Sequence, residues 1–507
     1  MATKRNTAQQ PKVNGASKKK RPWLLMLYMS VDAPNLERPL DLNLEELRRA
    51  LDGAPNAARK RVHVVVQVEY PSGVYKRYSL EPKTTTFLTS GLADSHKTLL
   101  HDFVEEVTTD PRFAADYRAL VLWGHAAGVA ESMEVPLPPP LLSLGGRTRV
   151  STAINDFLYK TFHTDRKQGL AISFIDVLLG ILNVGGVGSM TPQLKKLTHK
   201  LDLVGFDACF MSMVEIAHEL KDGVRYVLAP QASIGLQGWH YDLLLDHIIH
   251  DPKVTQPAML GREATQQVGL RASSPESLSL LDTNAIGDVR DKFRDLVFAL
   301  REAVGDPLAE MNLRHQVLAA FDSALWAGAR QFIDVQDLCC QLSSRIPIPK
   351  VRDAAVAVIK ALKGLVVDQL TTLNLPLGGV SIYCPWVRAT TAEVDEGVRN
   401  VEVDLLSYLS LEFVRSTWYW LLFLNPSNFV PAERHWIRRE VRQVARAAAA
   451  EAAWRFGANG REPDPKPGSR EPDPKPGGRE PDPKPGSRAP DPKPAGRGGE
   501  GRGDDYY

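Results

Sequence analysis

Apolar runs alternate with amphipathic stretches along the first part of the chain. Largely apolar runs over 23–30 and 119–123 and a valine-rich run over 61–68 predict buried strands, because strands that are covered on both faces show little polar alternation. Between the first two runs, apolar positions over 42–51 recur at helical spacing, and Gly53 closes the pattern. This order of strand, helix and strand predicts an α/β fold with a mostly parallel central sheet.

The same alternation resumes after residue 200. An apolar run over 203–206 leads into Asp207 and Cys209, and an amphipathic stretch over 212–221 follows it. The pattern also predicts helices at 97–107, 241–250, 286–304 and 351–370 and strands at 225–230, 277–281 and 379–383. The C-terminal half is therefore expected to continue the α/β fold.

Changes in composition divide the chain into segments. A Pro-rich repeat of nine residues fills the end of the chain, and its prolines favour an extended chain with no apolar residue to pack. Prolines and glycines also interrupt the pattern between the strands that precede His125 and Cys209. The expected segments are a disordered basic arm at 1–21, a core at 22–253 with an insertion at 131–190, an α/β extension at 254–431 packed on the core, a basic amphipathic helix at 432–456 and a disordered tail at 457–507.

Composition and charge exclude several classes of protein. Of the 507 residues, 43% are hydrophobic and 24% are charged, which permits a large core, and the net charge of +2 gives no bias toward nucleic acid. No apolar stretch reaches the roughly 18 residues of a membrane span. The four cysteines show neither zinc-ligand spacing nor the density of a disulfide scaffold. This usage favours a cytoplasmic location, and secretion without a signal peptide is the alternative.

The basic stretch at 432–456 has two interpretations. Its arginines and alanines predict either a solvated helix or a surface for an anionic partner, and the Pro-rich tail is a second candidate for binding a partner.

The first chemical hypothesis concerns Cys209 and His125. If their strands are parallel neighbours, both residues emerge at one edge of the sheet, where open α/β folds place their sites. A cysteine at the start of a helix is favoured as a thiolate, and a nearby imidazole can exchange its proton. The backbone N–H groups of Ala126 and Cys209 are the candidate oxyanion donors. The alternative for Cys209 is a buried, inert core thiol.

Two motifs at these positions resemble a known family. Leu122-Trp123-Gly124-His125, and the segment from Asp202 to Met211 with Val214-Glu215 after it, resemble the clostripain family of cysteine peptidases in the caspase-like clan. Lesser matches at 28–37, 238–241, 279–282 and 378–383 extend the resemblance over about residues 23–425 in collinear order.

The resemblance implies a fold and a reaction. The fold would be a caspase-like α/β/α sandwich, and a Cys209–His125 dyad would hydrolyse peptide bonds through a thioacyl-enzyme. Members commonly cleave after basic residues, and Asp207 matches an acidic position of the primary pocket. An alternative role for Asp207 is to cap the following helix. Gln237 stands where the family often has a second acidic residue, and Ala126 stands where it has glycine.

Three functions follow as hypotheses. The first is an active cysteine endopeptidase with protein or peptide substrates, and the second is an inactive relative that acts as a binding or scaffold protein. The third is another hydrolase or transferase that uses the same two residues. Some relatives are cut on maturation, and the candidate cut sites in the insertion are Arg147, Arg149, Lys160, Arg166 and Lys167.

No cofactor or metal is expected. Some family members respond to calcium, but the cluster of histidines and aspartates after residue 239 provides no complete ligand set and is typical of a solvated helix. This cluster consists of His240, Asp242, Asp246, His247 and His250.

Overall fold

The structure is a computed structural model, and all of the residues it describes lie within the first of two compact units, Met1–Ala448. The second unit, Ala449–Tyr507, lies outside the described residues, as do residues 1–19, nearly all of the predicted insertion and the predicted basic helix. The described residues are 20–31, 34–70, 72–92, 96–126, 128–129, 132–133, 197–251, 256–271, 275–303, 307–384, 387, 389–390, 393, 401–402, 408 and 411–418.

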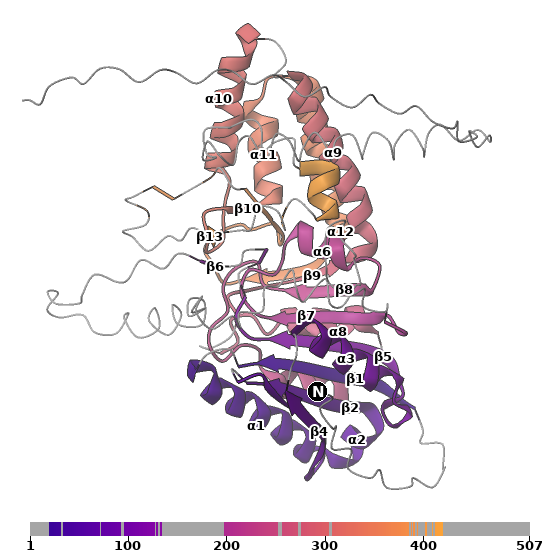
Figure 1. Cartoon of the computed structure of the whole chain (residues 1–507). Helices are drawn as coiled ribbons and strands as arrows, with labels where there is room; N and C mark the ends of the chain where they lie inside the picture. The colour runs from indigo at the N-terminus through magenta and orange to yellow at the C-terminus, as the bar shows by residue number, and fades with distance from the viewer. Residues whose placement is uncertain are drawn as a thin grey trace, which may run out of the picture. The chain divides into compact units, whose positions relative to one another are not determined.

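In this part of the chain, nine strands form one sheet in the order β11-β9-β8-β7-β5-β1-β2-β3-β4 (Figure 1). They are β1 (Arg21–Ser30), β2 (Val62–Glu69), β3 (Val74–Glu81), β4 (Thr84–Leu92), β5 (Ala115–Trp123), β7 (Leu201–Asp207), β8 (Val224–Ala229), β9 (Ser277–Asp282) and β11 (Val366–Thr371). The central strands β8, β7, β5, β1 and β2 are parallel, and the strands beyond them on each side are antiparallel. The predicted α/β fold with a mostly parallel centre is confirmed.

Short strands pair outside this sheet. β10 (Phe332–Asp334) pairs with β12 (Ser381–Tyr383), and β6 (Ser132–Met133) pairs with β13 (Val401–Glu402). A bridge between Met213 and Ser381 joins the chain after β7 to β12. Residues after 325 are thereby attached to the segment that contains Cys209.

The helices lie on both faces of the sheet. They are α1 (Glu37–Gly53), α2 (Pro55–Arg61), α3 (His96–Thr109), α6 (Val214–Leu220), α7 (Tyr241–His250), α8 (Pro257–Thr265), α9 (Ile286–Ala303), α10 (Pro307–Ser323), α11 (Val335–Arg345) and α12 (Pro349–Leu365), with single turns at Pro34–Leu36, Pro111–Phe113, Thr283–Ala285 and Val414–Trp418. None of the helices in the described segments is long and apolar enough to cross a membrane.

Side-chain alternation shows that α1 and α3 cover opposite faces. Tyr28 on β1 contacts the ring of Phe103 on α3, with centroids 6.0 Å apart, whereas Trp123 on β5 bonds to Asn43 on α1. Trp123 is level with Met29, the neighbour of Tyr28, so the two contacts lie on opposite faces. Helices α7 and α1 contact each other, as do α7 and α8, which places them in one layer.

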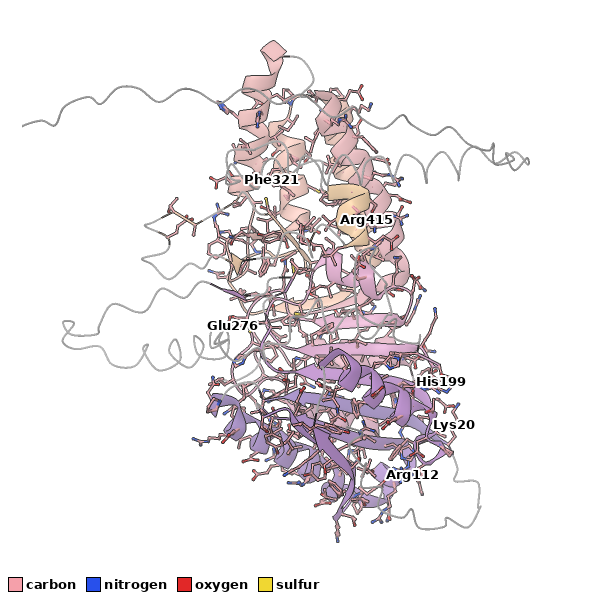
Figure 2. The ribbon with its side chains drawn as sticks, in the orientation of Figure 1. Lys20, Arg112, His199, Glu276, Phe321 and Arg415 are labelled. Carbon is pink, nitrogen blue, oxygen red and sulfur yellow. The ribbon has the colours of Figure 1, made fainter. Side chains whose placement is uncertain are left out.

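The strands end where the predicted site residues begin. In Figure 2, Lys20 and His199, which precede β1 and β7, lie at one end of the parallel strands. Glu276, which precedes the antiparallel β9, lies at the other end. This second end is the carboxyl edge of β5 and β7, where Cys209 and His125 follow their strands.

The sequence predictions and the structure differ at several elements. The hairpin of β3 and β4 is absent from the predictions, because β4 is largely exposed and polar and so lacks an apolar run. The helix predicted over 351–370 ends at Leu365, and β11 follows at once. The helix predicted from residue 212 begins at Val214.

Candidate active site

His125 and Cys209 follow two adjacent parallel strands. In the register of β5 and β7, Trp123 pairs with Asp207, and the Gly124 N–H donates to the Asp207 carbonyl over 3.4 Å. Each candidate residue therefore comes two positions after the last paired residue of its strand. β5 and β7 are parallel neighbours, which is the condition that the hypothesis for Cys209 and His125 required.

The Cys209 side chain is buried, with 1% of its surface exposed. The backbone N–H of Ile234 donates to Cys209 Sγ over 3.3 Å, and the Ile234 carbonyl lies 3.8 Å from the same sulfur. The N–H donor favours the thiolate, whereas the carbonyl that accepts from the sulfur favours the thiol, so the two contacts of this peptide act in opposite directions. The sequence predicts that the start of the following helix favours the thiolate. α6 begins only at Val214, and the N–H group that donates to the sulfur belongs to Ile234 instead.

His125 and Ala126 lie at the end of β5 and are both half-buried. Ala126 packs against the hydrophobic core. Their assigned roles as catalytic base and oxyanion donor remain predictions.

Asp207 is fully buried and holds the loop that precedes α7. Its Oδ2 accepts hydrogen bonds from the Trp239 N–H over 3.0 Å and from the Tyr241 hydroxyl over 2.9 Å. Gly238, with φ +64°, leaves room for this carboxylate, because a Cβ there would overlap its oxygens. The predicted cap on the following helix is wrong, since α6 has no side-chain cap and these bonds reach a loop about thirty residues later in the chain.

Gln237 lies in the same loop, and its residue is exposed. Its backbone carbonyl accepts a hydrogen bond from Asn43 Nδ2 over 3.0 Å. Gln237 therefore belongs to the loop that Asp207 binds through the Trp239 N–H. The roles of both residues toward substrate remain predictions.

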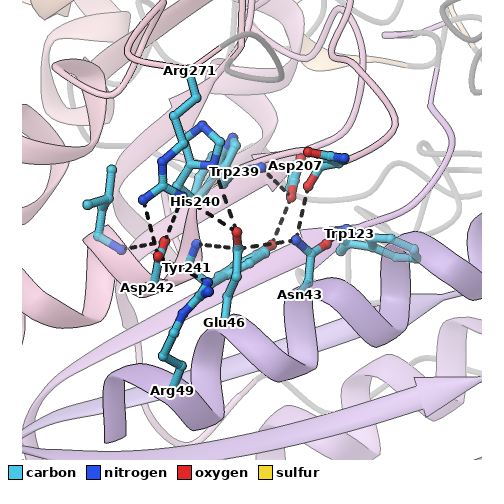
Figure 3. A network of polar contacts seen from close by, with 12 residues as sticks. Asn43, Glu46, Arg49, Trp123, Asp207, Trp239, His240, Tyr241, Asp242 and Arg271 are labelled. Atoms are coloured by element: carbon cyan, nitrogen blue, oxygen red, sulfur yellow. Dashed lines mark hydrogen bonds and ion pairs between the residues drawn. The ribbon is translucent and has the colours of Figure 1, made fainter. Parts of the chain in front are cut away.

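Asn43 and Glu46 of α1 are missing from the sequence predictions, yet they hold this loop from the other side (Figure 3). Asn43 Oδ1 accepts from Trp123 Nε1 over 2.9 Å, while its Nδ2 donates to Gln237. The two partners fix the orientation of the amide, because an indole can only donate and a carbonyl can only accept. The sequence does carry a signal for Asn43, because its amide lies on the same helix face as the buried leucines Leu40 and Leu47.

Glu46 extends the contacts of α1 toward the rim of the loop. Its Oε2 accepts from the Tyr241 N–H over 3.1 Å, and Arg271 lies 3.7 Å from its Oε1. Arg271 also donates two hydrogen bonds of 3.2 Å to Asp242. Partial burial opposes ionisation of Asp242, but Arg271, then the Leu243 N–H and then Arg49 outweigh it and lower the pKa of Asp242.

The predicted histidine and aspartate cluster divides among separate partners. Asp242 pairs with Arg271, His247 lies 3.7 Å from Glu263, and His250 Nδ1 lies 2.8 Å from Asp246. Across the described segments, no group of three or more His, Cys, Asp or Glu side chains is arranged to hold a metal ion.

Glu215, on α6, is a second fully buried carboxyl group near the nucleophile segment. Its Oε1 accepts from the Tyr383 N–H over 2.9 Å and from the Tyr408 hydroxyl over 3.0 Å. Burial raises the pKa of Glu215 to about 7, although both hydrogen bonds oppose the rise. This group connects α6 to β12 and to residue 408.

Comparison with known proteins gives one family and one fold. Residues 186–379, which include Cys209, match the family model described as the clostripain family. Among curated proteins, no sequence matches the chain.

Two solved structures are similar to this chain at low sequence identity. A secreted C11 cysteine protease from Bacteroides thetaiotaomicron, iotapain, is 14% identical, with 75% of this chain and 97% of that chain covered and a TM-score of 0.50. An inactive zymogen C11 protease from Parabacteroides distasonis is also 14% identical, with 79% and 99% covered and a TM-score of 0.49. The likeness to the first shows the fold, and the family match favours a peptidase over the scaffold hypothesis.

Proposed function

We propose that the chain is a cysteine endopeptidase of the clostripain family, whose model residues 186–379 match, and that Cys209 is its nucleophile and His125 its acid and base. The observation that carries this proposal is the pairing of β5 with β7, which brings both residues to the carboxyl edge of the sheet. The Ile234 N–H beside Cys209 Sγ supports it, because that donor stabilises the attacking thiolate.

The proposed reaction has two acyl-transfer steps. The Cys209 thiolate attacks the carbonyl carbon of the scissile peptide, and a C–S bond forms as the oxygen becomes an oxyanion bound by the N–H groups of Ala126 and Cys209. The oxyanion collapses, the C–N bond breaks, and His125 gives its proton to the leaving amine. His125 then takes a proton from water, the water attacks the thioester, and the C–S bond breaks to restore the thiolate.

We further propose a preference for a basic residue before the scissile bond. Asp207 lies two residues before the nucleophile, and a peptide N–H and a phenol hold its Oδ2. A carboxylate at this position would attract the cationic side chain of a substrate residue.

Peptide-library cleavage tests the proposal. The wild-type protein, Cys209→Ala, His125→Ala and the control Cys340→Ala are incubated with the library, and the products are identified by mass spectrometry. Cys340 is a free, exposed cysteine, so its variant reports any effect of thiol removal alone. We expect both site variants to lose roughly a thousandfold or more in kcat/KM, and Cys340→Ala to lose nothing. Cleavage that persists in Cys209→Ala would refute the assignment.

A further inference from the structure

The residue after the candidate nucleophile has a left-handed backbone. Phe210 has φ +62°, a region that residues with a Cβ rarely occupy and in which a bulky residue is an outlier. Within the described segments, Lys83 is the only other residue besides glycine with positive φ. Such a conformation persists only where the surrounding structure holds it, and it is concentrated at functional sites.

Backbone hydrogen bonds fix the turn of Phe210 against the segment 230–234. The Phe210 N–H donates to the Ala232 carbonyl over 3.1 Å, and the Ser212 N–H donates to the Pro230 carbonyl over 2.9 Å. One step further along, the Ile234 N–H donates to Cys209 Sγ. The segment that holds the Phe210 backbone therefore also supplies the N–H donor of the thiol.

The ring of Phe210 fixes the turn from the other side. The residue is 2% exposed, and its ring lies 5.6 Å from that of Phe332 on β10. Gly328 packs directly against the ring, where a Cβ would overlap it. The side chain therefore has little room to follow a change in the backbone.

We propose that Phe210 is a positioning residue, whose left-handed backbone keeps the Cys209 thiol on the Ile234 N–H. This inference rests on the proposed role of Cys209 as nucleophile. Rotation of φ at Phe210 to a negative value turns the peptide between Cys209 and Phe210 relative to the anchored residues after it. The bonds to Ala232 and to the sulfur then no longer form together.

Two substitutions separate the backbone effect from the loss of the ring. Phe210→Asn and Phe210→Val both remove the ring, but asparagine tolerates the left-handed region and a β-branched valine does not. The readout is the rate of alkylation of Cys209 by iodoacetamide at fixed pH, followed by mass spectrometry of the Cys209 peptide. We expect alkylation to be roughly tenfold slower in Phe210→Val than in Phe210→Asn. On a peptide substrate, kcat should fall in parallel while KM changes little.

Lys83 supplies the matched control. It has φ +60° in an exposed turn between β3 and β4, so Lys83→Asn and Lys83→Val impose the same backbone contrast away from the site. Both should leave the alkylation rate unchanged, even if valine lowers the melting temperature.

Equal alkylation rates in Phe210→Asn and Phe210→Val would overturn the inference. If the valine variant does not fold, Phe210→Ala takes its place, because alanine also disfavours the left-handed region. The alkylation readout needs no peptidase activity. Failure of the proposed function would instead appear as cleavage that does not depend on Cys209.

Discussion

Two buried carboxyl groups flank the nucleophile segment, and they differ in what they hold. Asp207, before Cys209, binds the loop that leads to α7, a loop that α1 also holds through Asn43. Glu215, after Cys209, binds the Tyr383 N–H and the Tyr408 hydroxyl. Both carboxyl groups are fully buried, so burial alone does not identify a substrate-binding group. Asp207 is therefore a candidate specificity residue, whereas Glu215 attaches distant parts of the fold to each other.

The largest expected effect concerns Glu215. Its pKa is 4.5 ordinarily and about 7 in the folded protein, so between these values the folded state keeps a proton that the unfolded chain releases. The stabilisation from this proton is complete below the ordinary pKa and is lost as the pH rises through about 7. Over this range the free energy of unfolding falls by roughly 3 kcal/mol. Glu215→Gln stays neutral, so it should become more stable than the wild type by a similar amount at pH 8.

Urea unfolding at several pH values between 5 and 8 measures this difference. Glu45→Gln, at an exposed position on α1, is the control and should track the wild type. If Glu215→Gln and the wild type lose stability in parallel with pH, Glu215 does not carry this proton.

The next effect concerns Asp207 and would sharpen the contrast between the two groups. Asp207→Asn removes the charge and keeps an oxygen for Trp239 and Tyr241. We expect the ratio of kcat/KM for arginine over leucine before the scissile bond to fall about tenfold to a hundredfold, because a hydrogen bond to a charged group is lost. Asp222→Asn, at a highly exposed aspartate, is the control. An unchanged ratio would make Asp207 a structural group like Glu215.

Asn43 tests whether α1 is part of the Asp207 region. Asn43→Leu removes two buried or partly buried hydrogen bonds, to the Trp123 indole and to the Gln237 carbonyl, which should cost about 2 kcal/mol of the free energy of unfolding. Chemical denaturation measures the change, and Asn56→Leu on the exposed side of α2 is the control. Equal stabilities of the two variants would contradict the role of Asn43.

Arg271 should give the smallest effect. Its side chain is 41% exposed, so Arg271→Ala should cost less than about 1 kcal/mol at low salt and still less at high salt. The pKa of Asp242 should rise toward its ordinary value, which NMR titration of the carboxyl carbon can follow. A large, salt-independent loss would place Arg271 in the structural core of the loop.

Local pattern predicted the centre of the fold because the central strands are covered on both faces. The residues of β1 and β2 are nearly all buried, and in the sequence β1 appears as a largely apolar run and β2 as a valine-rich one. The first residues of β4 are exposed, and β11 continues directly from a helix, so neither has such a run. Side-chain pattern is a weak guide where a strand is at the edge of a sheet.

The candidate site divides in the same way. Cys209 and His125 follow apolar runs, and a strand end can be predicted from the sequence alone. Asn43 meets its partner Gln237 across 194 positions, a contact that no local pattern predicts. The left-handed φ of Phe210 has no local signal either, because phenylalanine is not a residue typical of that region.

The attachment of the nucleophile turn to β12 has a consequence for synthesis of the protein. The Ser212 hydroxyl donates to the Gly379 carbonyl over 2.6 Å, and the Ser381 N–H donates to the Ser212 carbonyl over 2.9 Å. Both partners leave the ribosome long after Cys209 does, since translation proceeds from the N-terminus. The turn that carries the thiol can bond to the segment 230–234 soon after it is made, but it gains its bonds to Gly379 and Ser381 only later, and a nascent polypeptide that stops short of β12 lacks them.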